Sequence, residues 1–267
     1  MNYTLKKKIA TIPGVRFVIL KLLRSLAKDT TIQHPYTNKP LLLNTYKHKG
    51  YWYYSSDRES RTMRSFKEII TPGDVVIEVG GHIGFISMFF SSLIGKHGQL
   101  IVFEPGKNNL YYTHANLSPL FNTRIIEKGC SDVNDVLSFY EDNITGQNNS
   151  LLENYLGAAG VANTHGVDLV KNVRKIDVIR LDEFIRKEDL EVDFIKIDVE
   201  GAEKDVLIGM GNYLGKIQKI MVEVSENHKF IVNLLHEKGY ELFQDDLMTK
   251  FNPEQGQLSN VFAVLKS

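Results

Sequence analysis

The chain has 267 residues, of which 43% are hydrophobic and 24% are charged, as in an ordinary globular protein. Basic and acidic side chains number 32 each, so no overall charge favours nucleic acid as a partner. The single cysteine, Cys130, excludes an internal disulfide framework and a structural zinc site built from cysteines. We expect one large α/β domain with an appendage rather than two small domains.

The amino-terminal segment is locally basic, because only lysine and arginine supply charge before the first acid, Asp29. Apolar residues among them form a pattern close to an amphipathic helix, which Pro13 and Gly14 would break early. Arg16 and Lys21 interrupt the apolar core that a secretory signal needs, and the segment is too short to span a membrane. Weak contact with an anionic membrane surface therefore competes with packing on the domain or on a partner subunit in a homo-oligomer. We expect a cytoplasmic protein, peripheral at the inner membrane surface if that contact forms.

Three segments outside the regular pattern also carry predictions. The aromatic run at residues 51–54 fits either a strand or a surface that faces substrate. Helical spacing of apolar residues predicts a helix at residues 59–70, which ends at the turn residues 71–74. The segment 142–166 is rich in asparagine and glycine, and we expect a loop or short helix there, over the carboxyl end of the sheet, where it could act as a lid.

From residue 75 onward, strand and helix patterns alternate. This alternation predicts an α/β fold with a doubly wound, mostly parallel sheet and helices on both faces, closed by an antiparallel pair of strands. The predicted strands are 75–79, 100–103, 124–127, 136–140, 174–180, 193–198, 220–224, 239–243 and 260–265, and the predicted helices are 85–93, 107–117, 181–185 and 229–238.

A glycine loop follows the first buried strand. Gly80 and Gly84 stand where the strand must turn sharply into a helix, and glycine permits both the turn and the close approach of a ligand. Their spacing differs from the dinucleotide fingerprint G-x-G-x-x-G, which disfavours pyrophosphate binding. Glu104 ends the next strand about 20 residues later, where a ribose diol would lie. Glu78, at the end of the first strand, could face the cationic part of a ligand.

A second group of acids follows the strand predicted at residues 193–198. Because ligands bind at the carboxyl ends of parallel strands, we expect Asp198 and Glu200 to face a crevice. Glu200 and Glu203 are also explained without a ligand, as side chains that cap the following helix.

Three ordered motifs resemble those of the FkbM family of S-adenosylmethionine-dependent methyltransferases. They are PGDVVIEVGGHIG at residues 72–84, VFEP at 102–105 and DFIKIDVEGAE at 193–203. The resemblance implies the class I methyltransferase fold, a Rossmann-like seven-stranded, mostly parallel sheet with a terminal antiparallel hairpin. It divides the chain into a helical and aromatic appendage, residues 1–70, and an S-adenosylmethionine-binding domain, residues 71–267. It also implies an O-methyltransferase that acts on a hydroxyl of a sugar, a glycan or a related natural product.

The resemblance further implies how the cofactor is held. Glu78, Gly80 and Gly84 would hold its methionine part, with Ser87 beside them. Glu104 would accept hydrogen bonds from the ribose hydroxyls.

Asp132 would meet the adenine amino group, and Asp198 would lie near the methyl donor. The chain departs from the family's usual Asp-x-Gly-Ala-Asn-x-Gly loop, since Glu78, Gly81 and His82 replace the aspartate, alanine and asparagine. Glutamate keeps the charge of aspartate, whereas histidine does not reproduce the hydrogen bonding of asparagine.

A general base would assist the transfer, because a sugar hydroxyl is a poor nucleophile. The candidates are Asp198, then Glu223, an acid inside an apolar strand, and also Glu200 and His82. Asp198, Glu200 and Glu223 could instead hold a divalent metal such as magnesium, although no tight metal-ligand motif is present.

Two other functional classes compete with methyl transfer. An NAD-type oxidoreductase would need the G-x-G-x-x-G that this chain lacks. A non-catalytic, membrane-associated binding module would not need the glycine loop, Glu104 and Asp198 together. We therefore expect S-adenosylmethionine as cofactor and a small molecule or glycan as substrate.

Overall fold

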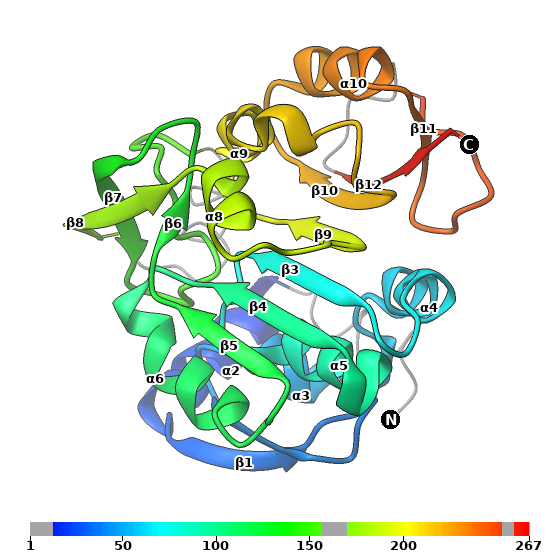
Figure 1. Cartoon of the computed structure of the whole chain (residues 1–267). Helices are drawn as coiled ribbons and strands as arrows, with labels where there is room; N and C mark the ends of the chain where they lie inside the picture. Colours follow the sequence, from blue (N-terminus) through cyan, green and yellow to red (C-terminus); the bar gives the residue numbers. More distant parts are fainter. Residues whose placement is uncertain (1–12, 156–169, 253–258, 267) are drawn as a thin grey trace.

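The computed structural model describes residues 13–155, 170–252 and 259–266, and its centre is a seven-stranded sheet (Figure 1). The strand order is β11-β12-β10-β9-β3-β4-β5. Strands β5, β4, β3, β9 and β10 run parallel, and β12 is antiparallel to both β10 and β11. This confirms the predicted sheet and its terminal antiparallel pair. The strands are β3 Val75–Val79, β4 Gln99–Phe103, β5 Thr123–Ile126, β9 Phe194–Ile197, β10 Lys219–Val224, β11 Tyr240–Phe243 and β12 Ser259–Leu265.

Helices cover both faces of this sheet (Figure 1). Successive side chains of a strand point to opposite faces, so Val76 of β3 packs in the cluster of α5, whereas Ile77 packs in the cluster of α8, α9 and α10. Both are fully buried, which explains why the inner strands read as continuous apolar runs. The helices are α4 Ser60–Ile69, α5 Phe85–Ile94 and α6 Lys107–Leu117 on one side, and α8 Leu181–Lys187, α9 Glu203–Gly209 and α10 His228–Glu237 on the other, with short 3-10 turns η1 Ser55–Asp57, η2 Gly95–His97 and η3 Gly211–Tyr213.

The segment before the sheet packs on the face formed by α4 and α5. Leu41 and Leu43 are fully buried in the same cluster as Phe66 of α4 and Phe90 of α5. The predicted appendage thus shares a core with the sheet, and the division at residue 70 stays a prediction. Its elements are α2 Pro13–Ser25, β1 Asp29–Gln33, β2 Pro40–Asn44 and α3 Lys49–Tyr54.

Of the two alternatives for residues 51–54, the strand was wrong, because these residues belong to the short helix α3. Pro13 and Gly14 begin α2, because proline suits the first turn, where the backbone N–H has no partner within the helix. The interruption of a longer helix at Pro13 stays a prediction. Residues 1–12 lie outside the described residues.

Helix α2 presents apolar side chains to solvent. Val18 and Leu22 of α2 and Leu26 directly after it are 65%, 57% and 64% exposed. Their spacing of four residues places them on one side, because the Leu26 N–H still bonds the Leu22 carbonyl. None of the helices within the described ranges combines the length and the apolar content needed to cross a lipid bilayer.

A second, three-stranded sheet stands beside the carboxyl edge of the first. Its order is β6-β8-β7, from Gly129–Cys130, Lys171–Ile179 and Asp135–Asp142. The strands predicted at 136–140 and 174–180 are therefore longer than expected and pair with each other outside the main sheet. The predicted lid segment, 142–166, falls partly in residues 156–169, outside the described residues, so its closing motion stays a prediction.

Candidate active site

A cavity of about 300 Å³ opens at the carboxyl ends of the parallel strands, at the point where the order of strands in the sheet reverses. From β3 the chain continues outward to β4 and β5, whereas β9 and β10 extend the sheet on the other side of β3. The loops after β3 and β9 therefore diverge and leave a crevice between them, as at other topological switch points. Side chains and backbone from the ends of β3, β4, β9 and β10 line this cavity, together with parts of α3 and of the small sheet.

The glycine loop lies directly against the end of β9. Gly80 has a φ of +90°, and a Cβ there would lie 1.8 Å from the carbonyl oxygen of Asp198. Gly84, with a φ of +84°, precedes α5, and a Cβ there would lie 2.8 Å from a methyl of Leu117. Only glycine therefore lets the loop turn this tightly and approach β9 so closely.

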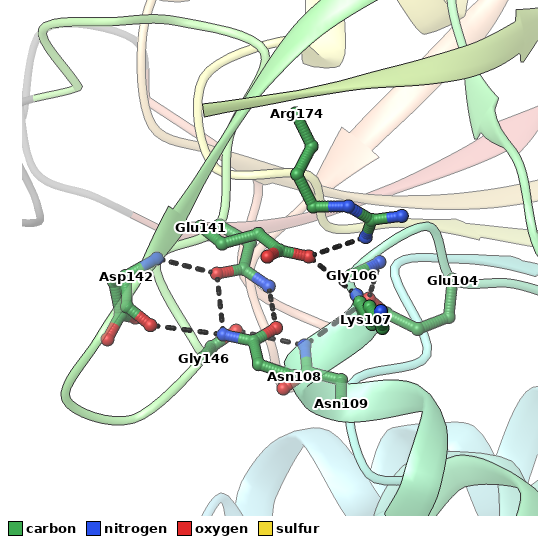
Figure 2. A network of polar contacts seen from close by, with 10 residues as sticks. Glu104, Gly106, Lys107, Asn108, Asn109, Glu141, Asp142, Gly146 and Arg174 are labelled. Carbon is green, nitrogen blue, oxygen red and sulfur yellow. Dashed lines mark hydrogen bonds and ion pairs between the residues drawn. The ribbon is translucent and has the colours of Figure 1, made fainter. Parts of the chain in front are cut away.

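Glu104 is buried at the end of β4, and backbone groups hold its carboxylate (Figure 2). Its Oε2 accepts a hydrogen bond from the backbone N–H of His82 at 2.7 Å, and its Oε1 accepts one from Gly106 at 2.8 Å. Asn109 Nδ2 donates to Oε1 at 3.3 Å. Burial raises the pKa of Glu104 to about 7, although these hydrogen bonds act in the opposite direction.

Figure 2 shows how the asparagine-rich segment after β7 is tied to the start of α6. The Glu141 carboxylate pairs with Arg174 at 2.9 Å and accepts the backbone N–H of Lys107 at 2.6 Å. Asn149 Nδ2 donates to Asn108 Oδ1 at 2.7 Å. These bonds bring Asn149 and the neighbouring residues 146 and 147 to the cavity wall.

Lys196 of β9 is fully buried between two carboxylates. Its Nζ lies 2.9 Å from Asp198 Oδ2 and 3.5 Å from Glu78 Oε1. Burial alone would lower the pKa of Lys196, but the charges of Asp198 and Glu78 outweigh burial and raise it. Burial raises the pKa of Glu78 to about 7, although Lys196 and a 2.5 Å hydrogen bond from Ser87 Oγ oppose that rise. Ser87 is absent from the cavity lining, so it contacts Glu78 rather than the cavity.

Glu223 and Glu200 also line the cavity, beside Asp198. The negative charge of Asp198 is the largest cause of the raised pKa of Glu223, followed by burial. For Glu200, burial is the largest cause of a raised pKa, followed by the charge of Asp198. In their ionised form, both carboxyls are therefore stronger bases than the carboxylate of an exposed glutamate.

Glu200 and Glu203 do not occupy the N-cap position of α9, although Glu203 lies in the first turn, where its charge suits the helix dipole. The residue at the start of α9 is Ala202, and no side chain caps this helix. Glu203 instead accepts hydrogen bonds from the Gly201 N–H at 2.8 Å and from Ser225 Oγ at 2.9 Å. Glu200 faces the cavity because its left-handed backbone, with a φ of 54°, turns the chain just after β9.

His82 joins three parts of the site. Its Nε2 donates to the carbonyl of Thr145 at 3.4 Å, so its Nδ1 accepts from the hydroxyl of Tyr51 at 3.0 Å. Burial lowers the pKa of His82 to about 4, so the ring is neutral at pH 7. Histidine in place of the family's asparagine thus binds the glycine loop to α3 and to the segment after β7.

Asp132 is absent from the cavity lining. Its backbone carbonyl accepts a hydrogen bond from Arg180, and its carboxylate accepts one from Ser131. Lys128 and Cys130 line the cavity just before it, so the adenine contact of Asp132 stays a prediction.

Arg58, Asn109 and Lys196 are among the cavity residues that carried no assigned role in the sequence prediction. The sequence could have indicated that Lys196 is paired, since a lysine inside an apolar strand is almost never buried without a partner. Nothing in the sequence indicates a role for Arg58, because only folding brings its segment to the end of the sheet.

The sequence profile described as the methyltransferase FkbM domain matches residues 78–242, more than half of the chain. The chain belongs to this family. S-adenosylmethionine is accordingly its cofactor, and the family assignment argues against the NAD-type alternative.

Two relatives of this FkbM-family chain share less than a third of its residues over the aligned parts. The 2-O-methyltransferase NoeI of Sinorhizobium fredii is 28% identical over 165 residues, which cover 60% of this chain and 66% of NoeI, just under two thirds of its length. Methyltransferase 1 of Beauveria bassiana is 26% identical over 188 residues, which cover 62% of this chain and 71% of that protein. Among solved structures, Aeropyrum pernix fibrillarin, with natively bound S-adenosyl-L-methionine, has a TM-score of 0.44 and 15% identity, and the match covers 73% of this chain and 68% of that one.

The residues of the cavity fit this cofactor. Asn109 Oδ1 is buried, has no hydrogen-bond partner within the described residues and stands next to Glu104. Both side chains can accept hydrogens from ribose hydroxyls. At the other end, Glu78 and Asp198 supply negative charge for a sulfonium and an ammonium group.

The described residues contain no group of three or more histidine, cysteine, aspartate or glutamate side chains arranged to hold a metal ion. The alternative in which Asp198, Glu200 and Glu223 hold magnesium therefore gains no support from this arrangement.

Proposed function

We propose that this protein transfers a methyl group from S-adenosylmethionine to a hydroxyl of a sugar, a glycan or a related natural product. The observation that carries the proposal is the pair of carboxyls, Glu200 and Glu223, that lines the cavity with raised pKa values. A hydroxyl acceptor needs a base to take its proton, and carboxylates bind sugar hydroxyls well. The relative NoeI is a 2-O-methyltransferase, which agrees with such an acceptor.

Glu223 is the proposed general base, in preference to Asp198. Lys196 occupies one oxygen of Asp198 in an ion pair, so that oxygen is already engaged and is less available to an acceptor hydroxyl. Glu223 lies in β10 beside the charge of Asp198, and within the described residues its carboxyl forms no hydrogen bond or ion pair. The candidate base His82 is a weaker choice, because its pKa is lowered and both ring nitrogens already have partners.

When bound, the cofactor supplies a methyl group on a positively charged sulfur. The residues of this chain contribute position and charge: the glycine loop sets how closely a ligand approaches β9, and Asp198 offers a carboxylate there. Glu223 would take the hydroxyl proton as the new carbon–oxygen bond forms and the methyl–sulfur bond breaks, with S-adenosylhomocysteine as the neutral leaving group. Glu78 and Glu104 do not need to take part in that proton transfer.

The test is transfer of a labelled methyl group from S-adenosylmethionine to a panel of mono- and oligosaccharides, with amines as comparison acceptors. The expected product is a methyl ether on one sugar hydroxyl. Methylation of an amine alone, with every hydroxyl compound inert, would discard the O-methyl assignment.

We also infer a weak contact between α2 and an anionic membrane surface. The exposed apolar face formed by Val18, Leu22 and Leu26 is flanked by the exposed basic residues Lys21 and Arg24. An apolar face with basic flanks suits a bilayer of anionic lipid better than a neutral protein surface. A cytoplasmic location, peripheral at the inner membrane surface, would agree with this contact and stays a prediction.

A further inference from the structure

Arg58 reaches the cavity from a part of the chain that precedes the family match at residues 78–242. It lies between η1 and α4, and its guanidinium stands 4.5 Å from the ring centroid of Tyr51. Its Nη2 pairs with Glu59 Oε1 at 3.0 Å. Its Nε is buried and has no hydrogen-bond partner within the described residues. A buried N–H without a partner is unfavourable, so this atom indicates a ligand.

The other cations of the cavity are already paired. Lys196 contacts Asp198, Glu78 and the carbonyl of Gly80. Lys128 lies 3.3 Å from the carboxylate of Asp177. Among the described cavity residues, Arg58 is thus the cation with a buried donor still to be satisfied.

Arg58 stands on the glycine-loop side of the cavity. The Tyr51 ring beneath it lies 4.6 Å from the Phe85 ring, and the Tyr51 hydroxyl bonds His82. His82 belongs to the glycine loop, and Phe85 is the first residue of α5. The amino-acid part of the cofactor is expected at this end of the cavity.

A ligand at this end must satisfy both signs of charge. Glu78 and Asp198 call for a positive group, and the free donor of Arg58 calls for an acceptor, best an anion. An α-amino acid carries both groups on one carbon. We propose that Arg58 binds the α-carboxylate of S-adenosylmethionine, while the acids at the ends of β3 and β9 face its ammonium group; the proposal rests on the cofactor assignment.

A carboxylate on the acceptor would offer Arg58 the same chemistry, so the test omits the acceptor. Calorimetric titrations would compare S-adenosylhomocysteine with 5′-methylthioadenosine, a thioether of the same nucleoside that lacks the amino-acid part. The proteins would be the wild type, Arg58→Met, Arg58→Lys and the control Arg61→Met. Arg61 lies three residues further along the chain, in α4, is largely exposed and pairs with Asp245 and Asp246, so its loss changes the net charge equally.

Arg58→Met should weaken S-adenosylhomocysteine binding about 10- to 100-fold, as for the loss of one charge-assisted hydrogen bond. Its affinity for 5′-methylthioadenosine should change less than about two-fold, which also shows that the variant is folded. Arg58→Lys should be intermediate, because lysine keeps the charge without the planar fork. Arg61→Met should match the wild type.

If Arg58→Met bound S-adenosylhomocysteine as tightly as the wild type does, the role of Arg58 would be overturned and the cofactor assignment would stand. An equal loss for both ligands would also overturn it, since Arg58 would then act only by supporting Tyr51 and Glu59. Failure of the wild type to bind S-adenosylhomocysteine would overturn the cofactor assignment together with it. Methyl transfer to a sugar is tested separately, so the two outcomes stay distinct.

Discussion

Lys196 Nζ and Asp198 Oδ2 lie 2.9 Å apart at the end of β9. Residues two apart on a strand point to the same face, which places the lysine beside the aspartate, and Lys196 is also in register with Glu78 of β3. The strongest acid candidate from the sequence is therefore the cavity-facing half of an ion pair with the fully buried Lys196. The role of proton acceptor passes to Glu223, whose pKa the charge of Asp198 raises.

Replacing Lys196 should destabilise the fold. Lys196→Met leaves the carboxylates of Glu78 and Asp198 near each other without their buried counter-charge, which typically costs about 3–5 kcal/mol of unfolding free energy. Denaturant titration would measure this loss. The double variant Lys196→Met with Glu78→Gln should recover part of it, and a loss below about 1 kcal/mol in the single variant would contradict a structural ion pair.

Cofactor binding should weaken as the pH falls. The pKa of Glu104 is raised to about 7 in the free protein, and only its ionised form accepts two hydroxyl hydrogens. S-adenosylhomocysteine should therefore bind progressively less tightly below pH 7, by up to about ten-fold per pH unit once most of the carboxyl is protonated. Calorimetric measurement of the dissociation constant between about pH 5.5 and about pH 8 would show this trend, because that range brackets the pKa of Glu104.

Glu104→Gln supplies the control for that trend. It should bind S-adenosylhomocysteine about 10- to 100-fold less tightly at pH 8 and show a flatter pH dependence. Glu78 has a similar pKa and would leave some residual slope, whereas His82, with a pKa of about 4, stays neutral over most of the range. An unchanged slope in Glu104→Gln would assign the titration to another group.

A side chain at position 80 should disrupt the site. Gly80→Ala would place a Cβ 1.8 Å from the carbonyl oxygen of Asp198, in a backbone conformation that alanine rarely adopts. We expect loss of measurable S-adenosylhomocysteine binding and a lower melting temperature. Gly73→Ala is the matched control, because it has the same unfavourable sign of φ with open space around its Cβ. It should lower stability without weakening the binding of S-adenosylhomocysteine, and equal binding losses in both variants would contradict the steric explanation.

Removal of the proposed base should affect turnover rather than cofactor binding. Glu223→Gln should lower kcat by about 10²- to 10⁴-fold on an accepted sugar, while the affinity for S-adenosylhomocysteine stays close to that of the wild type. Asp198→Asn should instead weaken cofactor binding. Should Glu223→Gln turn over at the wild-type rate, the base would have to be sought at Glu200.

The apolar face of α2 should support binding to anionic vesicles. Leu22→Asp adds a negative charge at the centre of that face and should reduce flotation with phosphatidylserine-containing liposomes several-fold, and high salt should reduce wild-type flotation. Phe121→Asp, at another exposed apolar residue, is the matched control. Equal flotation of Leu22→Asp and wild type would reject the membrane contact, and a dimer lost in Leu22→Asp would assign the face to a second copy.

The sequence by itself determined the inner strands of the sheet and three of the residues that stand at their carboxyl ends. Apolar runs that are buried on both faces can only be inner strands, and Gly80, Glu104 and Asp198 each follow one of them directly. Local order in the chain therefore places these residues at the carboxyl edge before any contact is known.

Only the tertiary structure decided what surrounds them. Arg58, Tyr51 and Asn149 come from distant segments, and the small sheet places its own residues along the cavity instead of extending the main sheet. Burial and neighbouring charges, which depend on all of these segments, set the ionisation of Glu223 and of His82. The sequence lists the ionisable groups, but only their distances in the folded chain determine which are paired and which can take a proton.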